Sequence, residues 1–472
     1  NKENSIRERK GKMGRRKKHY KLFIAILPLI LMLIGVGAYI YFSKDIGVVT
    51  ASTEEDMVYE GSVDKAGDLL NSGDEVIVNL KIKNITNNKK EKIEGKLICD
   101  GESKPLGKSN FSIDTLEPNE EGNVQWKVKC KSGGTRFIVQ VKESNKGLKN
   151  IKLGGITVGG KGWFMGDNHT HSNYSDGNGS VAENIWAMRS AGLNYMTMTD
   201  HNNSNGYEES KSAKGNGEII IKGNEYTTSS GHAVLMNVKD NKNYSSLSKD
   251  NLIKELGNYN TLIYAAHPFD SRLSWKFPDY NGVNGIEVWN GCRGPKNKYN
   301  NDAFIQWDKL NTEGKHLYGV AETDAHYPVD IGKVYLKTYS ESFTEEGIIE
   351  AQKKGHMYGT NGPSLEIKVN NAMMGDDYKV SSMGEVIKVN LKGEYYNGIS
   401  KVRLIRNGEV ISEKNINDNT FEMVERVRVV PGDFIRMEVE GKEEEGQSLL
   451  TEVGVRNTAP FAFSNPIFII EK

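Results

Sequence analysis

The segment from residue 160 to residue 364 alternates short apolar runs with segments of helical character, and this alternation restricts the fold more than any other feature. The strand-like runs are YMTMTD, GEIIIKGNE, TLIYAAH, GIEVWN and LYGVAETD, and the clearest helical segments are SVAENIWAMRSAG and TEEGIIEAQKKG. Such an order is typical of an α/β layer or barrel. No glycine-rich loop of P-loop or dinucleotide type follows any of these runs, which argues against nucleotide-cofactor chemistry.

Histidines and carboxylates stand next to the ends of these apolar runs. Of the nine histidines in the chain, six lie there: His169, His171, His201, His232, His267 and His326. The carboxylates in comparable positions are Asp200, Glu225, Glu287 and Asp324. In parallel α/β folds, the loops that follow the carboxyl ends of several strands converge on one face. We therefore expect these side chains to share one site.

A shared cluster of this kind favours a metal site. Neutral imidazoles with carboxylates are the ligand set of Zn, Mn or Fe, and the carboxylates would repel one another without a cation. His169 and His171 are two residues apart, as are Asp324 and His326, so each pair projects to one face of an extended segment. Taken singly, each histidine has an ordinary alternative as a surface or capping residue. Taken together, they predict metal binding.

Five motifs in this segment resemble, in order, those of the polymerase and histidinol phosphatase (PHP) superfamily of metal-dependent phosphoesterases. They are HTHSNYSDG, TDHN, GNEYTTSSGHAVLM, AAHP and TDAH. The flanking β-rich segments, GTNGPSLEI and the terminal SNPIFI resemble more narrowly the CehA/McbA branch of this superfamily, which includes a carbamate-ester hydrolase. The resemblance implies a distorted (β/α)7 barrel that holds two or three divalent ions, of Zn, Mn or Fe.

The resemblance also implies which residues hold the ions. The implied ligands are, for the first ion, His169, His171, Glu225 and Asp324; for the second, Glu225 as a bridge with His232 and His267; and for the third, Asp176, His201 and His326. The TTSSG between Glu225 and His232 predicts a tight hairpin that brings these two residues together. Asp176 has an alternative role as the cap of a helix that begins near Ser180.

The chemistry implied by the resemblance uses a metal-bound water or hydroxide and no protein nucleophile. Of the three arginines in residues 160–364, Arg272 and Arg293 lie in loops shortly after ligand-bearing runs. Guanidinium groups pair well with anionic oxygens, so we predict that both contact the substrate; a solvated loop charge is the alternative. Asp200 and Glu287 are predicted to orient imidazole N–H groups.

Two segments that flank this domain, residues 50–155 and 365–472, consist of short runs with a two-residue alternation of apolar and polar side chains. This pattern predicts all-β, sandwich-like domains, and neither contains a histidine. We interpret the first as a spacer or adhesion module. Cys99 and Cys130 each end a strand-like run and could form a disulfide on the oxidising side of a membrane; two unpaired buried thiols are the alternative.

The N-terminus predicts a basic cytoplasmic tail, residues 1–21, and a transmembrane signal anchor, residues 22–43. Leu22–Phe42 contains 21 residues without a charge, and the tail holds ten Lys or Arg against two Glu. Basic residues stay on the cytoplasmic side, so the rest of the chain is expected outside the cytoplasm. A cleaved signal peptide is the alternative, but its apolar region usually has about 7 to 15 residues and ends in small side chains, whereas this one ends in Tyr41 and Phe42.

Together these inferences predict a single-pass, membrane-anchored, extracytoplasmic metal-dependent hydrolase. A phosphoesterase that acts on a phosphorylated or ester small molecule or cell-surface substrate fits best. A carboxyl or carbamate ester hydrolase, or a non-enzymatic surface binding protein, is the alternative. The formal net charge is zero and no basic patch with interleaved aromatic residues occurs in residues 160–364, which argues against nucleic acid as a partner.

Overall fold

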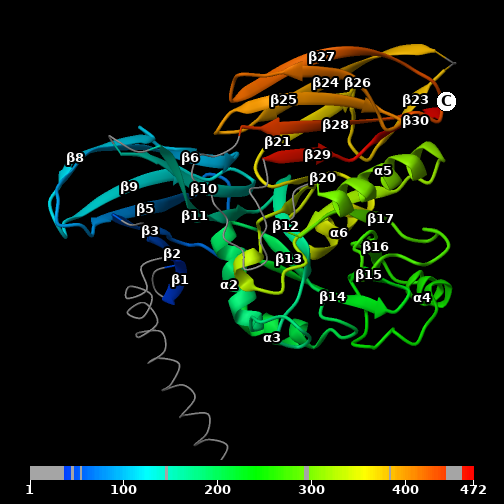
Figure 1. Cartoon of the computed structure of the whole chain (residues 1–472), viewed down its shortest axis with the longest axis horizontal. Coiled ribbons are helices and arrows are strands. Elements are labelled where there is room, and N and C mark those ends of the chain that lie inside the picture. The colour runs from blue at the N-terminus through cyan, green and yellow to red at the C-terminus, as the bar shows by residue number, and fades with distance from the viewer. Residues whose placement is uncertain are drawn as a thin grey trace, which may run out of the picture.

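Three parts follow one another along the chain: an N-terminal pair of sheets, a central α/β domain and a C-terminal pair of sheets (Figure 1). The computed structural model describes residues 37–43, 47–53, 56–143, 147–291, 297–381, 384–442 and 460–472. The predicted basic tail and most of the predicted membrane span lie outside these residues. The last seven residues of that span, Gly37–Ser43, form a strand. Among the described residues, no helix is both long and apolar enough to cross a bilayer.

The N-terminal part is a sandwich of two sheets, with strand orders β1-β2-β3-β5-β9-β7 and β4-β11-β10-β6-β8. Its strands are β1 (Gly37–Ser43), β2 (Gly47–Thr53), β3 (Met57–Val63), β4 (Leu69–Leu70), β5 (Glu75–Asn84), β6 (Lys90–Gly101), β7 (Lys104–Pro105), β8 (Asn110–Leu116), β9 (Glu121–Lys129), β10 (Gly133–Lys142) and β11 (Leu148–Val158). Burial alternates residue by residue along β5, as the two-residue sequence pattern requires when one face packs on a core. The two cysteines are not bonded to each other, and burial raises the pKa of Cys99 to about 12 and that of Cys130 to about 11.

The central domain alternates strands with helices along the chain. Its elements are β12 (Gly162–Thr170), α2 (Val181–Ala191), β13 (Tyr195–Met198), α3 (Asn205–Ala213), β14 (Ile219–Thr228), β15 (Gly231–Met236), α4 (Lys249–Leu256), β16 (Leu262–Ala266), β17 (Gly285–Asn290), α5 (Lys298–Thr312), β18 (Tyr318–Glu322), η1 (Pro328–Asp330), β19 (Tyr335–Ser340) and α6 (Glu345–Lys353). The strands are almost wholly buried because helices cover one face and the core fills the other. The α/β prediction for this domain is confirmed.

The sheet departs from a regular repeat of parallel strands at two places. The β14–β15 hairpin makes β15 antiparallel to both of its neighbours, and β19 runs antiparallel to β12. The hairpin is the one predicted from TTSSG. A parallel bridge between Thr170 and Ala325 joins the end of β12 to the segment that follows β18, so these two strands of the curved sheet meet at their carboxyl ends.

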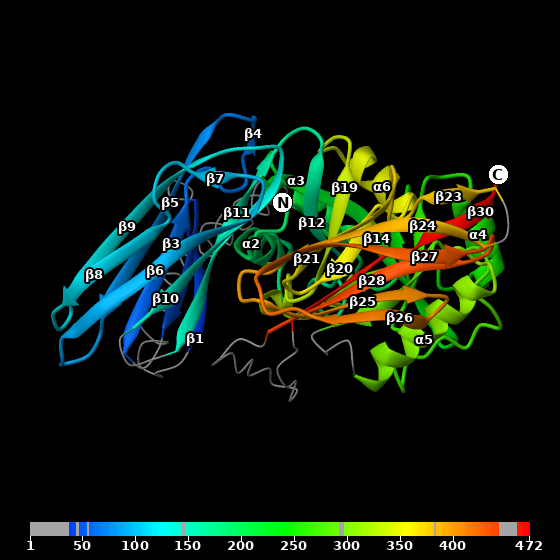
Figure 2. The ribbon, with the colours of Figure 1, turned by 90° about the horizontal axis from the view of Figure 1, so that it is seen from above.

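The C-terminal part continues the barrel sheet and packs a second sheet against it. Its strands are β20 (Met357–Thr360), β21 (Ser364–Val369), β22 (Ala372–Met373), β23 (Asp377–Val380), β24 (Glu385–Glu394), β25 (Ile399–Arg406), β26 (Glu409–Asn415), β27 (Thr420–Val429), β28 (Phe434–Gly441), β29 (Phe461–Ser464) and β30 (Ile467–Glu471). From β12 the ladder runs through β19, β20, β29, β28 and β25 to β26, whereas β22, β21, β24 and β27 form the separate sheet. Figure 2 shows these strands beside the barrel helices.

Buried ion pairs tie the three parts together. Asp100 in the N-terminal sandwich accepts hydrogen bonds from Arg136, at 2.6 Å, and from Lys337 of the barrel, at 2.7 Å. Lys337 also donates to Ser364 at the start of β21, over 2.9 Å. These groups lie at a cleft of about 480 Å³ whose walls come from all three parts. On the other side, Arg436 of β28 forms a two-pronged ion pair with Asp308 of α5.

Candidate metal centre

The nine predicted ligands converge at the carboxyl ends of the barrel strands. They come from β12 and the loop after it, the loops after β13, β16 and β18, and the β14–β15 hairpin: His169, His171, Asp176, His201, Glu225, His232, His267, Asp324 and His326. Each belongs to at least one group of three or more ligand-type side chains whose nitrogen and oxygen atoms adjoin. The structure therefore brings together every residue of the predicted set.

Glu225 lies at the middle of the cluster. Its two carboxylate oxygens lie between 2.7 and 3.5 Å from a ring nitrogen of each of five histidines: His169, His171, His201, His232 and His267. The Glu225 side chain is fully buried in the second half of β14. The hairpin places His232 next to it, with His232 Nδ1 at 2.9 Å from Glu225 Oε1. A shared, bridging carboxylate is the role that the sequence resemblance implied for Glu225.

A second group adjoins Glu225 on its buried side. Asp324 Oδ1 lies 3.3 Å from His169 Nε2 and 3.1 Å from His171 Nε2. Both imidazoles are completely buried, because β12 carries His169 into the barrel and His171 directly follows this strand. This group matches the set expected for the first ion.

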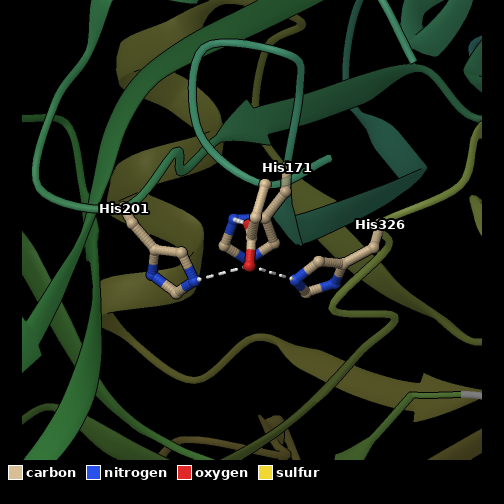
Figure 3. A group of neighbouring side chains, drawn as sticks. His171, His201 and His326 are labelled. Carbon is tan, nitrogen blue, oxygen red and sulfur yellow. Dashed lines mark ion pairs between the residues drawn. The ribbon is translucent and has the colours of Figure 1, made fainter. Parts of the chain in front are cut away.

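A third group forms the exposed side of the centre. Asp176 Oδ2 lies 3.4 Å from His201 Nε2 and 3.2 Å from His326 Nε2, and Figure 3 shows the imidazoles of His171, His201 and His326 around this position. The side chains of Asp176, His201 and His326 are 55%, 25% and 33% exposed. The alternative role of Asp176 as a helix cap is wrong, because Ser180 caps α2 in a reciprocal capping box with Glu183. This open group is where a substrate can reach the centre.

Two ligand residues have unusual backbone conformations. Asp324 has φ of 51° and His267 has φ of 27°, in the left-handed region that L-residues rarely adopt. His267 directly follows β16, and Asp324 closely follows β18. At both places the chain must turn sharply to point the side chain into the site. Such strain persists only where the surrounding structure enforces it, and it concentrates at functional sites.

The two predicted orienting carboxylates have different roles. Glu287 lies 3.0 Å from His169 Nδ1, as expected for an imidazole partner, and also accepts a hydrogen bond from the backbone N–H of His267. Asp200 contacts no imidazole in this way; it accepts hydrogen bonds from the hydroxyls of Ser172 and Ser175. Asp200 therefore fixes the loop between His171 and Asp176.

Several polar residues of the site were not predicted from the sequence. Thr227 lies 2.6 Å from His201 Nδ1, and Asn290 donates to Asp324 over 3.3 Å. Glu322 is fully buried below His169, and neither of its carboxylate oxygens has a hydrogen-bond partner. Its position at the carboxyl end of an apolar run was the available indication, since the same rule selected Glu225 and Glu287.

Charge inside the site favours a cation. Burial alone would lower the pKa of His169, but Asp324 and neighbouring carboxylates outweigh it and raise this pKa well above its usual range. Burial alone would raise the pKa of Glu225, but the imidazoles, led by His169, hold it well below its usual range. Ionised carboxylates thus occupy a low-dielectric interior, where either protonated imidazoles or a bound cation can supply the positive charge that they need.

The arrangement also fits divalent ions geometrically. Ligand atoms about 2.1 Å from one ion lie about 3.0 to 3.4 Å apart at tetrahedral or octahedral angles. His267 Nε2 lies 3.2 Å from Glu225 Oε1, and the two contacts of Asp324 Oδ1 fall in the same range. His169 Nε2 is buried without a hydrogen-bond partner, and Glu225 Oε2 is buried 2.7 Å from His201 Nδ1. Such atoms are available to a metal.

The predicted substrate contacts differ from the metal ligands. Arg272 has a side chain that is 78% exposed and lies 3.7 Å from Asp270, so it is a solvated loop charge in this structure. Arg293 lies outside the described residues. Arg272 has no described contact with the metal centre.

Comparison with known families agrees with the geometry of this centre. Residues 167–276 match the family model of the PHP domain. The matched residues run from β12 to the segment that follows β16 in the central domain. Four of the five motifs lie within the matched residues, and the TDAH motif with Asp324 and His326 follows them in the chain.

Parts of the chain are also similar to solved structures. One is a two-domain protein from Bacteroides vulgatus that contains a predicted PHP-like metal-dependent phosphoesterase: 16% identity, 59% of this chain, 91% of that chain, TM-score 0.39. Another is PsfC from Pseudomonas syringae: 15% identity, 40% of this chain, 87% of that chain, TM-score 0.32. No curated protein sequence matches the chain.

Proposed function

We propose that the protein is a metal-dependent phosphoesterase that is anchored in the cell membrane and presents its PHP domain outside the cytoplasm. The observation that most supports the catalytic part is the buried Glu225, whose carboxylate adjoins five imidazoles. Burying ionised groups costs free energy unless opposite charges compensate them. A site of this composition would therefore be unfavourable if it served only to stabilise the fold. Metal-assisted hydrolysis uses such a ligand set directly.

The candidate site in the PHP domain has a buried half and an open half, and the two halves have different roles. Divalent ions, when bound, polarise phosphoryl oxygens and lower the pKa of water. When Glu287 is ionised, its carboxylate has no proton to donate and can only accept a hydrogen bond. The Nδ1 of His169 then donates to Glu287, and the Nε2 of His169 faces the centre. The open half, with Asp176, His201 and His326, is where the phosphoryl group of a substrate would approach.

Hydrolysis assays on the full chain test the catalytic part of this proposal. With added Mn²⁺ or Zn²⁺, we expect hydrolysis of p-nitrophenyl phosphate or bis(p-nitrophenyl) phosphate to exceed that of a p-nitrophenyl carbamate run in parallel. His171→Asn should abolish this activity, whereas His316→Asn, which changes a half-exposed histidine outside the site, should retain it. Faster carbamate hydrolysis would instead support the ester hydrolase alternative, and activity that survives His171→Asn would refute a role for this centre.

The location of the protein is a separate part of the proposal. It is supported by the uncharged Leu22–Phe42 and by the ten basic residues that precede it. An alkaline phosphatase domain fused after residue 50 should be active in intact cells, because that enzyme requires export. An inactive fusion that is expressed at normal levels would place the PHP domain in the cytoplasm. An extracytoplasmic site would act on phosphorylated small molecules or cell-surface polymers.

A further inference from the structure

The cleft of about 480 Å³ between the three parts of the chain lies at the amino end of β12. Trp163 and Met165 of this strand line the cleft, whereas His169, near the other end of the strand, belongs to the metal centre. The four residues from Met165 to His169 span about 13 Å of extended strand. None of the described residues that line the cleft belongs to the metal-ligand set. The cleft is therefore a second concave site, separate from the metal centre.

Aromatic side chains form much of the wall of this cleft. Among the described residues, the aromatic side chains that line it are Trp163, Tyr358, Tyr395, Tyr396 and Phe421. They come from β12, from β20, from the segment that follows β24 and from β27. The ring of Trp163 packs edge-on against that of Tyr358, with the ring centroids 5.2 Å apart. Trp163, Tyr396 and Phe421 are only partly buried, so a ligand in the cleft can contact their rings.

Polar groups with further hydrogen-bonding capacity also line the cleft. Lys337 donates to Asp100 and to Ser364, and among the described residues these bonds account for two of its three N–H groups. Ser364 accepts this bond, so its hydroxyl proton can be donated to another group. A carboxylate has about four acceptor positions, and Asp100 uses part of them for Lys337 and Arg136. The cleft therefore offers a ligand both donors and acceptors.

The charges at the cleft balance one another. Ion pairs at its mouth are Glu102 with Lys131, Glu366 with Lys368, and Lys392 with Glu422. Deeper in the cleft, Arg136 and Lys337 share the single carboxylate of Asp100, which leaves one positive charge. Glu394, an exposed residue that lines the cleft, adds one negative charge. The described groups therefore favour neither an anionic nor a cationic ligand.

We propose that this cleft binds a neutral saccharide, independently of the metal centre. A sugar ring has a face of C–H groups that packs on an aromatic ring, and its hydroxyl groups both donate and accept hydrogen bonds. A wholly apolar ligand would instead remove water from Lys337, Ser364 and Asp100 without replacing its hydrogen bonds, which costs free energy. Ligand sites commonly lie between domains and combine aromatic walls with a few polar groups, as this cleft does.

Calorimetry with three trisaccharides tests the proposal on the full chain loaded with Mn²⁺. The probes are chitotriose, cellotriose and maltotriose, and we expect at least one of them to bind. Trp163→Leu and Phe421→Leu keep an apolar side chain but remove the ring, so each should weaken this binding about tenfold. Trp275→Leu, which changes a partly buried tryptophan outside the cleft, is the matched control and should bind as the wild type does. Thermal unfolding of each variant checks that it folds.

The outcomes separate a saccharide in the cleft from other occupants and from the metal centre. Binding that both ring variants weaken and the Trp275 variant retains supports the proposal. Binding of none of the three trisaccharides, or binding that both folded ring variants retain, refutes it. Inorganic phosphate should not compete with the saccharide, and competition would place the saccharide at the metal centre and overturn the proposal. Tighter binding of adenosine than of any trisaccharide, weakened by the same ring variants, would assign the cleft to a flat aromatic ligand and also overturn it.

Discussion

The imidazole of His169 points one nitrogen at Glu287, 3.0 Å away, and the other into the cluster around Glu225. Both side chains are completely buried. A carboxylate in this position fixes the tautomer of the ring and makes the opposite nitrogen a better metal ligand. Glu287 also holds the backbone of His267, so one side chain positions parts of two ligand-bearing segments.

Glu287→Gln should weaken metal binding without unfolding the PHP domain. The amide retains an acceptor oxygen but loses the charge that supports the imidazole, and such changes typically cost about 10- to 100-fold in metal affinity. Titration of the metal-free full chain with Mn²⁺ measures this loss. Glu341→Gln, which changes a 75% exposed carboxylate paired with Lys161, should leave the affinity unchanged. Equal affinity in the Glu287 variant and the wild type would contradict the orienting role.

Asp200→Asn should loosen the loop that carries Asp176. Asp200 accepts hydrogen bonds from both Ser172 and Ser175, and an amide cannot accept through its nitrogen. We expect the ion nearest Asp176 to be lost first, so that metal content falls by about one ion per chain while the ions held by the buried ligands remain. Elemental analysis after dialysis gives the stoichiometry. Simultaneous loss of all ions would show that the loop and the buried half are not separable.

The free energy of unfolding should decrease at acid pH because of Asp100. Burial alone would raise the pKa of Asp100, but Lys337 and Arg136 outweigh it and hold this pKa below its ordinary value. Because the folded pKa lies below the unfolded value, the stabilisation is fully present above about pH 4 and is lost as the pH falls below that. Asp100→Asn should cost about 3 to 5 kcal/mol at pH 7, and the difference from wild type should shrink toward pH 2.5. Urea unfolding at both pH values measures this, and a constant difference would contradict it.

Arg436→Met should destabilise the protein although Arg436 lies far from the metal ligands in the sequence. Its guanidinium is only 4% exposed and pairs with Asp308, so the variant leaves a largely buried carboxylate without compensation. We expect a loss of about 3 to 5 kcal/mol in the free energy of unfolding. Arg428→Met, at an exposed arginine that donates to a backbone carbonyl, should cost less than about 1 kcal/mol. Thermal unfolding with and without Mn²⁺ distinguishes lost stability from lost metal.

Sequence reasoning located the residues of the cluster from their positions at the ends of apolar runs and from the resemblance of five motifs to a known family. His169 and His171 are two residues apart on an extended segment and project to the same face. Histidines and carboxylates also stand at the ends of the other apolar runs. This reasoning could not decide whether Asp176 is a ligand or a helix cap, and it assigned Asp200 to an imidazole although the folded loop places Asp200 on Ser172 and Ser175. It also missed Asn290 and Thr227, whose polar side chains gain their role from neighbours distant in the sequence.

The fold could be predicted from the sequence to a similar extent. Period-two alternation indicated the flanking sheets, and alternating runs indicated the barrel. The continuation of the barrel sheet into the C-terminal part was not predictable, because it depends on the pairing of Tyr358 with Ser464, more than a hundred residues later. Local patterns specify strands, whereas the partner of an edge strand is decided by the packing of the whole chain.

The ladder that passes from β19 through β20 to β29 means that the central domain has no free edge on that side. Cutting the chain between these modules would expose a row of unpaired backbone groups on an apolar strand, which invites aggregation. A shortened protein that keeps the central domain but lacks residues 460–472 would therefore be expected to accumulate as insoluble material when it is expressed in bacteria.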